Sequence, residues 1–209
     1  AHIGQAHHVV AVVLEVGRQH EVGHLARAGR RVDGPRFKQV RERRMTHFNW
    51  WQIPSARTAA IWHNRLQRFA EETRLGIPIT IASDPRNHFS RNIFSMAASD
   101  FSQWCETLGF AAIGEEDLVR QFADIVRREY LAVGIRVALH PQIDLATEPR
   151  WPRINGAFGE DAHLTARLGK AYIEGFQGEA LGPHSVACMT KHFPGGGPQK
   201  EGLDPHFDF

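Results

Sequence analysis

The feature that most constrains the fold of this 209-residue chain is a regular alternation of short apolar segments with amphipathic segments. In three amphipathic segments the apolar residues recur at steps of three and four, which predicts three helices with one buried face each. The apolar segments around them are short and predict strands. The expected strands are residues 45–51, 77–82, 135–139 and 185–189, and the expected helical faces run from Ala59 to Phe69, from Leu118 to Tyr130 and from Leu164 to Phe176. This alternation is typical of parallel βα units.

The residues between these segments agree with the predicted boundaries. Ser55 precedes the first helical segment and is expected to be its N-cap. Gly76, Gly134 and Gly178 follow the three helical segments and are expected to end them. Four βα units fit both an open doubly wound sheet and the first half of a (β/α)8 barrel, and the alternation alone does not separate the two.

The composition is that of an ordinary folded domain and argues against several classes of protein. Hydrophobic residues make up 42% and charged residues 23% of the chain, and the net charge of +2 is too small to predict a nucleic acid or a membrane surface as partner. The longest apolar run, residues 9–14, is far below the ~20 residues of a membrane span, and no signal-peptide pattern is visible. Cys105 and Cys188 lie in no metal or redox motif, so both are expected to be buried free thiols.

The N-terminal segment, residues 1–33, differs from the rest of the chain. It holds five of the 13 histidines and a run of arginines. A metal site is one interpretation, but the histidines lack the spacing that would close a tetrahedron. We therefore predict a poorly ordered or locally helical extension over residues 1–33, one domain over residues 34–209, and no metal ion or cofactor.

Three polar clusters directly follow three of the expected strands. They are Ser83–Arg86, His140–Asp144 and Lys191–Gly197. The carboxyl ends of parallel strands meet at one edge of a sheet, so the clusters are expected to form one shared site. Taken singly, each cluster also fits a polar loop that caps a helix.

Several motifs follow one another along the chain: WHN at 62–64, LGIPITIASDPR at 75–86, EYLAVGIRVALHPQIDLATEPRWPR at 129–153, FGED at 158–161, GFQG at 175–178 and KHFPGGGPQ at 191–199. Together they resemble the N-terminal domain of glycoside hydrolase family 3, most closely its bacterial β-glucosidases and exo-glucanases. The resemblance implies a TIM-barrel-type (β/α)8 domain, of which this chain would hold only the first half.

The resemblance also implies a pocket that holds one terminal sugar by its hydroxyls. Asp84, Arg153, Lys191 and His192 match the substrate-binding residues of the family. A carboxylate accepts from adjacent hydroxyls, while Lys, Arg and His supply donors, which suits a small and very polar ligand.

Each of these residues also has a purely structural interpretation. Asp84 precedes a proline and fits a turn, and Arg153 could pair with Glu160 or Asp161. Arg150 is expected to pair with Glu148 rather than with a ligand.

The catalytic groups implied by the resemblance have no clear counterpart. A retaining glycosidase needs a carboxylate nucleophile and an acid/base about 5–5.5 Å apart. The family nucleophile is an aspartate on a later strand, and the usual glutamate acid/base lies in a second domain. The β-N-acetylglucosaminidases use an Asp-x-His dyad instead, which Asp204 and His206 resemble, with Pro205 between them and a longer spacing from Lys191.

The expected function is therefore hydrolysis of O-glycosidic bonds by a β-glucosidase-like, exo-acting, retaining glycosidase. The expected ligand is a β-glucoside or short oligosaccharide, and the chain alone is expected to be inactive. The alternatives are a non-catalytic sugar-binding remnant and a β-N-acetylglucosaminidase-type enzyme. Because half a barrel exposes sheet edges, a C-terminal portion or a homodimer is expected to complete it.

Overall fold

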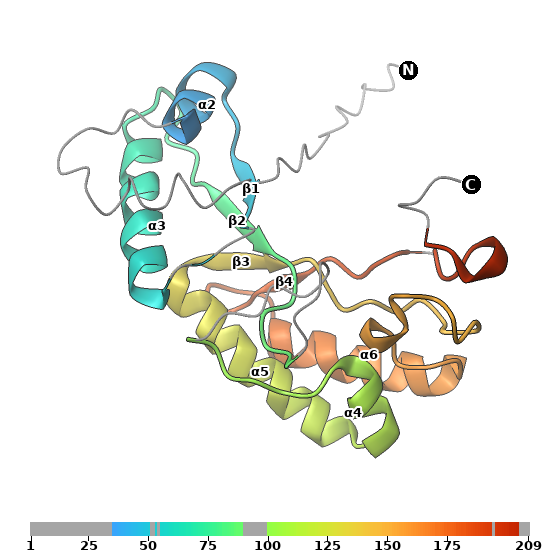
Figure 1. Ribbon diagram of the computed structural model, residues 1–209. Helices are drawn as coiled ribbons and strands as arrows, with labels where there is room; N and C mark the ends of the chain where they lie inside the picture. Colours follow the sequence, from blue (N-terminus) through green and yellow to red (C-terminus); the bar gives the residue numbers. More distant parts are fainter. Residues whose placement is uncertain (1–34, 51–52, 54, 90–99, 194, 205–209) are drawn as a thin grey trace, which may run out of the picture.

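A four-stranded parallel sheet, with its strands in the order β1-β2-β3-β4, lies at the centre of the structure (Figure 1). This computed structural model describes residues 35–50, 53, 55–89, 100–193 and 195–204, so the expected extension over residues 1–33 lies outside the described residues. The elements are α2 (Pro35–Arg43), β1 (His47–Asn49), α3 (Ala56–Glu71), β2 (Thr80–Ser83), α4 (Thr107–Ile113), α5 (Glu116–Val133), β3 (Ile135–Ala138), η1 (Ile154–Gly156), α6 (Ala162–Gln177), β4 (Ala187–Cys188) and η2 (Lys200–Gly202).

The order of the strands separates the two architectures that the sequence left open. All four expected strands are present, although each is shorter than predicted. The strands add to the sheet in one direction, with Phe48 opposite Ile81 and Ala138 opposite Cys188. A doubly wound sheet reverses direction after its first strands, whereas a barrel does not. The fold is therefore that of the first half of a (β/α)8 barrel.

The three expected helices are confirmed as α3, α5 and α6, and most of their boundaries agree. Ser55 caps α3, its hydroxyl accepting from the backbone N–H of Thr58 at 3.2 Å. Gly134 and Gly178 end α5 and α6 at positive φ, 91° and 76°. The expected end at Gly76 is wrong: α3 stops at Glu71, and hydrogen-bonded turns fill the residues between them.

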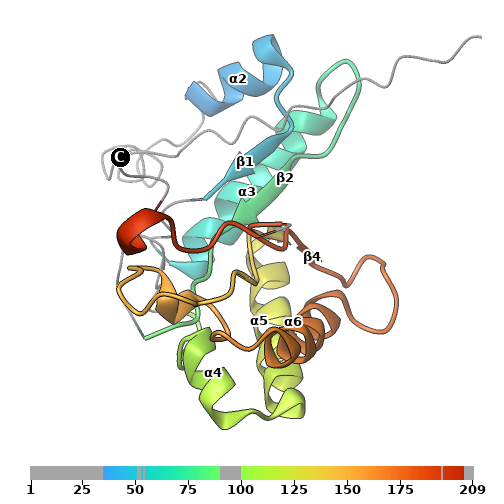
Figure 2. The same ribbon diagram turned by 90° about the vertical axis from the view of Figure 1, so that its right-hand side faces the viewer.

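Helices α5 and α6 lie side by side below the sheet in both views (Figures 1 and 2). A Cβ on Gly175 would lie 2.5 Å from both the Cβ of Ala123 and the carbonyl oxygen of Arg120, so the helices cross in close contact. The expected apolar faces supply the core between them and the sheet, which includes Leu66, Phe69, Ile81, Phe122, Val126, Tyr130, Ile135, Leu168, Tyr172 and Phe176.

Two α-helices within the described residues were not predicted from the sequence. Helix α4 has seven residues, too few for a helical period to stand out, and ends at Gly114 with φ 77°. Helix α2 is mostly charged, and only Phe37 and Val40 are buried on its described part. Helix α4 is therefore too short, and helix α2 too polar, to show the apolar periodicity by which the other helices were found.

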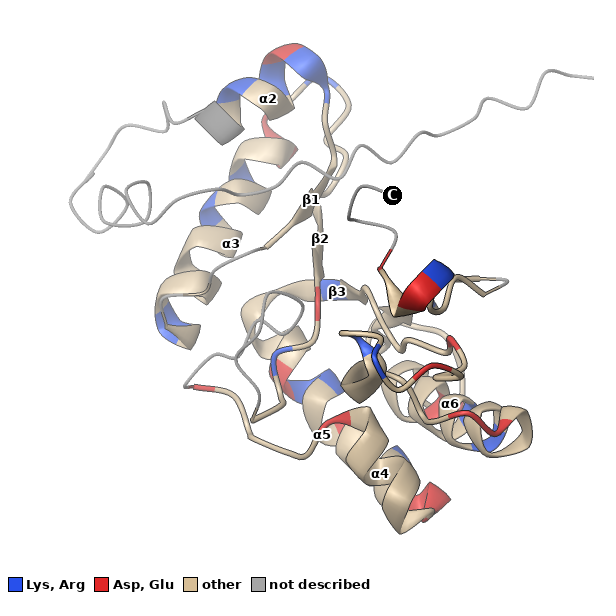
Figure 3. Cartoon of the chain, turned by 45° about the vertical axis from the view of Figure 1, so that its right-hand side comes forward, with Lys and Arg blue, Asp and Glu red and all other residues tan. Residues whose placement is uncertain are grey.

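Charged side chains are spread unevenly over the helices (Figure 3). Helices α2 and α3 carry mainly lysine and arginine, whereas α5 and α6 carry both signs and pair them across their contact, as Arg120 does with Glu174 at 3.1 Å. No helix within the described residues is both long enough and apolar enough to cross a membrane. The two cysteines are free as predicted, but both are half-buried rather than buried.

Candidate active site

The polar clusters after β2 and β4 meet at the carboxyl ends of the strands. Lys191 Nζ lies 2.9 Å from Asp84 Oδ1, across a separation of 107 residues in the chain. On its other side Asp84 Oδ2 accepts from the amide of Asn49, which ends β1, at 3.3 Å. Both charged side chains are partly open to solvent, Asp84 at 20% and Lys191 at 24%. The carboxylate is therefore held by its neighbours and still accessible to a ligand.

The loop that carries Asp84 is fixed by buried groups beneath it. Arg86 is buried, and its Nε donates to the hydroxyl of Ser83 at 2.6 Å while a second nitrogen donates to the carbonyl of Trp50. Burial lowers the pKa of Arg86 to about 10, which still leaves it charged at neutral pH. The hydroxyl of Tyr130 donates to the carbonyl of Asp84 at 3.2 Å.

His140, after β3, is clamped between two tyrosines. Its Nε2 lies 3.1 Å from the hydroxyl of Tyr130, and its Nδ1 lies 2.6 Å from that of Tyr172. Burial, with the nearby charge of Lys191, lowers the pKa of His140 well below its ordinary value, so the ring is neutral. The bond from His140 to Pro141 is a cis peptide, as is the one from Lys191 to His192.

Arg153 is buried among partners from three segments. Its Nη2 donates to the side-chain oxygen of Gln142 at 2.9 Å, its Nη1 lies 3.3 Å from Nε2 of His192, and the same Nη1 lies 3.8 Å from a carboxylate oxygen of Asp204. Of the two carboxylates expected as alternative partners, Asp161 caps α6 instead, accepting from the N–H of Leu164 at 2.7 Å.

Arg150 pairs with Glu148, as predicted. Its Nη2 donates to the carboxylate at 2.8 Å and its Nε at 3.0 Å. The hydrogen bond from Arg150 lowers the pKa of Glu148 to about 2. Arg150 is thus paired with Glu148 beside the site and is not part of it.

Asp144 is a site residue that the sequence reasoning did not single out. Its side chain is fully buried, and it accepts from His192 Nδ1 at 2.7 Å and from the backbone N–H groups of His192 and Gly196 at 3.2 and 2.7 Å. Burial alone would raise the pKa of Asp144, but these hydrogen bonds outweigh it and the pKa lies below its ordinary value. Its position at the end of the polar motif after β3 was the available signal.

The proposed Asp204–His206 dyad is only half within the described residues. Asp204 is fully buried, and one of its oxygens accepts from the indole N–H of Trp151 at 3.2 Å. His206 lies outside the described residues, so the dyad stays a prediction.

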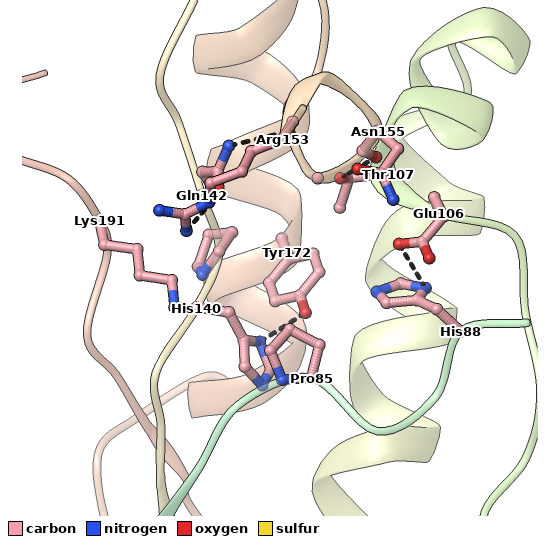
Figure 4. Close-up of a pocket in the computed structure, with 12 residues that line it drawn as sticks. Pro85, His88, Glu106, Thr107, His140, Gln142, Arg153, Asn155, Tyr172 and Lys191 are labelled. Atoms are coloured by element: carbon pink, nitrogen blue, oxygen red, sulfur yellow. Dashed lines mark hydrogen bonds and ion pairs between the residues drawn. The ribbon is translucent and has the colours of Figure 1, made fainter. Parts of the chain in front are cut away.

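A pocket opens between these loops and α4 (Figure 4). Lys191 and Arg153 line one side of it, and His88 and Glu106 line the other. Asp84 and His192 are not among its lining residues but contact Lys191 and Arg153, respectively. The wall formed by His88 and Glu106 was not predicted from the sequence; His88 Nδ1 lies 4.0 Å from Oε2 of Glu106. Within the described part of the chain, no group of three or more His, Cys, Asp or Glu side chains is placed to hold a metal ion.

The family model for the glycosyl hydrolase family 3 N-terminal domain matches residues 14–206. The chain belongs to this family. The resemblance seen in the ordered motifs is thereby confirmed.

Curated relatives agree with this assignment. β-Glucosidase C of Emericella nidulans is 55% identical over 171 residues, which are 80% of this chain and 28% of that protein. A periplasmic β-glucosidase/β-xylosidase of Dickeya chrysanthemi is 55% identical over 147 residues, which are 69% of this chain and 22% of that protein. The chain thus spans about a quarter of the length of these relatives.

Solved structures of family 3 share the fold. A β-N-acetylglucosaminidase from Paenibacillus superposes with a TM-score of 0.65 at 26% identity, over 76% of this chain and 29% of that one. A β-glucosidase variant from Listeria innocua, in complex with laminaribiose, superposes with a TM-score of 0.60 at 26% identity, over 76% of this chain and 20% of that one.

Proposed function

We propose that the site at the ends of β2, β3 and β4 binds one sugar ring and serves a β-glucosidase-like, exo-acting, retaining glycosidase that hydrolyses O-glycosidic bonds. The observation that carries the proposal is the contact between Asp84 and Lys191 at 2.9 Å, with Arg153 and His192 paired at 3.3 Å. These are the four residues that match the family's sugar-binding set, and they form two adjacent pairs.

The chemistry of the four side chains suits a hexose. Asp84 offers two carboxylate oxygens to neighbouring hydroxyls, and Lys191 and Arg153 offer charged donors. Hydrogen bonds to charged groups contribute about 1.5–3 kcal/mol each, enough for a few of them to hold a small ligand that has little apolar surface. The proposed ligand is a β-glucoside or a short oligosaccharide, and the reaction needs no cofactor.

The named relatives support this choice of ligand. β-Glucosidases are among the most similar curated proteins, from both a fungus and a bacterium. The superposing structure from Listeria innocua holds laminaribiose.

Calorimetric titration of the 209-residue chain with glucose tests the proposal. Lys191→Met is expected to weaken binding about 10- to 100-fold, because it removes one charged donor. Lys170→Met is the matched control, since Lys170 is 76% exposed on α6 and pairs with Glu174. Absence of glucose binding to the folded chain, or equal losses in both variants, would refute the proposal.

A further inference from the structure

The ring of His192 is held between a carboxylate and a guanidinium. Its Nδ1 lies 2.7 Å from Oδ2 of Asp144, and its Nε2 lies 3.3 Å from Nη1 of Arg153. The two partners come from different segments, Asp144 from the loop after β3 and Arg153 from the turn before η1. Each ring nitrogen therefore has its own partner.

The two partners require the same tautomer. An ionised carboxylate can only accept a hydrogen bond, so Nδ1 must carry the proton that faces Asp144. A guanidinium can only donate, so Nε2 must present a lone pair to Arg153. A proton on Nε2 would set two donors against each other, and a bare Nδ1 would set two acceptors against each other.

The side chain of Asp144 is held in one orientation. Its side chain is fully buried, and its Oδ1 is occupied by the backbone N–H groups of His192 and Gly196, which leaves Oδ2 aimed at the imidazole. A Cβ on Gly196 would lie 3.0 Å from the Cβ of His192, so a glycine there allows the loop to approach this closely. The carboxylate is thus held in place by its hydrogen bonds to the loop after β4.

We propose that Asp144 is a positioning residue that locks His192 in the neutral Nδ1–H tautomer, so that the nitrogen directed away from Asp144 is a hydrogen-bond acceptor. A buried carboxylate selects the tautomer of an imidazole in other enzymes by the same rule.

This inference rests on the proposed function for its consequence. The family resemblance implies that the Lys-His pair donates to neighbouring hydroxyls. In the tautomer inferred here Nδ1–H donates to Asp144 and the single lone pair of Nε2 accepts from Arg153, so the ring has no proton to give to a sugar hydroxyl, and Lys191 and Arg153 remain the donors.

Long-range proton–nitrogen NMR correlations of the histidine rings in the sugar-free chain test the inference. The spectra are recorded about two pH units above the ordinary histidine pKa of ~6.5, and His192→Asn identifies the signals of His192. The expected pattern is a protonated Nδ1 and an unprotonated Nε2. A protonated Nε2 in the unaltered chain would overturn the inference.

Two matched variants sharpen the test. In Asp144→Asn the side-chain oxygen keeps the two backbone N–H groups, so the amide NH2 takes the place of Oδ2 and donates to Nδ1. Because the contact at Nδ1 is the shorter one, 2.7 Å against 3.3 Å from Nε2 to Arg153, it is expected to decide the tautomer, which therefore reverses. Asp204→Asn changes an equally buried carboxylate that contacts Arg153, and is expected to leave the tautomer of His192 unchanged. An unchanged tautomer in folded Asp144→Asn, or a reversal in both variants, would contradict the assignment.

The calorimetric titration with glucose separates this inference from the proposed function. A chain with His192 in the Nδ1–H form that fails to bind glucose would refute the proposed function alone. A chain that binds glucose with Nε2 protonated would refute the role of Asp144 alone.

Discussion

Gly175 lies where α6 crosses α5, and replacing it by alanine tests the close packing that holds these two helices together. The added Cβ would lie 2.5 Å from both the Cβ of Ala123 and the carbonyl oxygen of Arg120, and 3.1 Å from the backbone nitrogen of Asp124. Carbon atoms in contact normally stay about 3.5–4.0 Å apart, so the helices would have to separate by roughly 1 Å. Two of the three obstructing atoms belong to the backbone of α5, which cannot rotate out of the way.

The magnitude follows from two opposing effects. Alanine is favoured over glycine inside a helix by about 1 kcal/mol, whereas overpacking of a closely packed core typically costs 1–3 kcal/mol and more when backbone must move. Because backbone atoms obstruct the new Cβ, we take the overpacking cost at the upper end of this range, about 3 kcal/mol. After subtracting the gain of about 1 kcal/mol, we expect Gly175→Ala to lower the free energy of unfolding by about 2 kcal/mol, or the melting temperature by roughly 4–8 °C for a domain of this size.

Gly169→Ala in the same helix is the matched control. Its Cβ would meet only Cγ2 of Ile143, at 3.4 Å, which is an ordinary contact. That variant is expected to be neutral or up to about 1 kcal/mol more stable. Urea unfolding followed by circular dichroism measures both variants. A Gly175→Ala chain as stable as Gly169→Ala would show that the helix crossing is looser than described.

Three further predictions concern the glycine that ends α5, the loss of stability at acidic pH and a buried histidine. Gly134→Ala is expected to destabilise the chain by more than about 1 kcal/mol in urea unfolding, because φ is 91° and the new Cβ would lie 2.3 Å from the ring of His63. The pKa of Asp144 is lowered in the folded chain, so its contribution to stability is present above the ordinary aspartate pKa and is lost as the pH falls through the folded value. The free energy of unfolding, measured against pH, should therefore fall less steeply at acidic pH in Asp144→Asn than in the unaltered chain. An equally steep fall in both chains would argue against a lowered pKa of Asp144. His140→Phe removes both ring nitrogens that form hydrogen bonds with buried tyrosine hydroxyls, and is expected to lower the free energy of unfolding by about 1–3 kcal/mol. A loss of less than about 0.3 kcal/mol would mean that these two hydrogen bonds add little to stability.

The sequence predicted the parts of the fold that depend on local patterns. The faces of α3, α5 and α6 follow from the spacing of apolar residues, and Ser55 and Gly134 mark boundaries that a side-chain cap and a positive φ require. Helix α4 escaped prediction because two turns are too short to show a period. The strands are shorter than their apolar runs, since burial extends beyond the residues that pair.

The site could be predicted only in part, for a similar reason. That Asp84 and Lys191 approach each other follows from their positions after neighbouring parallel strands, and the ordered motifs pointed to the family. The roles of Asp144 and of the wall formed by His88 and Glu106 depend on how loops distant in sequence fold over one another. Trp151 and Asp204 are an example: they are 53 residues apart, and their hydrogen bond at 3.2 Å joins the segment after β4 to the loop that carries Arg153.

The most direct test of the central claim is a crystal structure of the chain with glucose bound. We expect one sugar ring whose hydroxyls lie within about 2.7–3.2 Å of the Asp84 carboxylate and of Lys191 Nζ. A glucose bound elsewhere, or no sugar beside these two residues in crystals grown at saturating glucose, would contradict it.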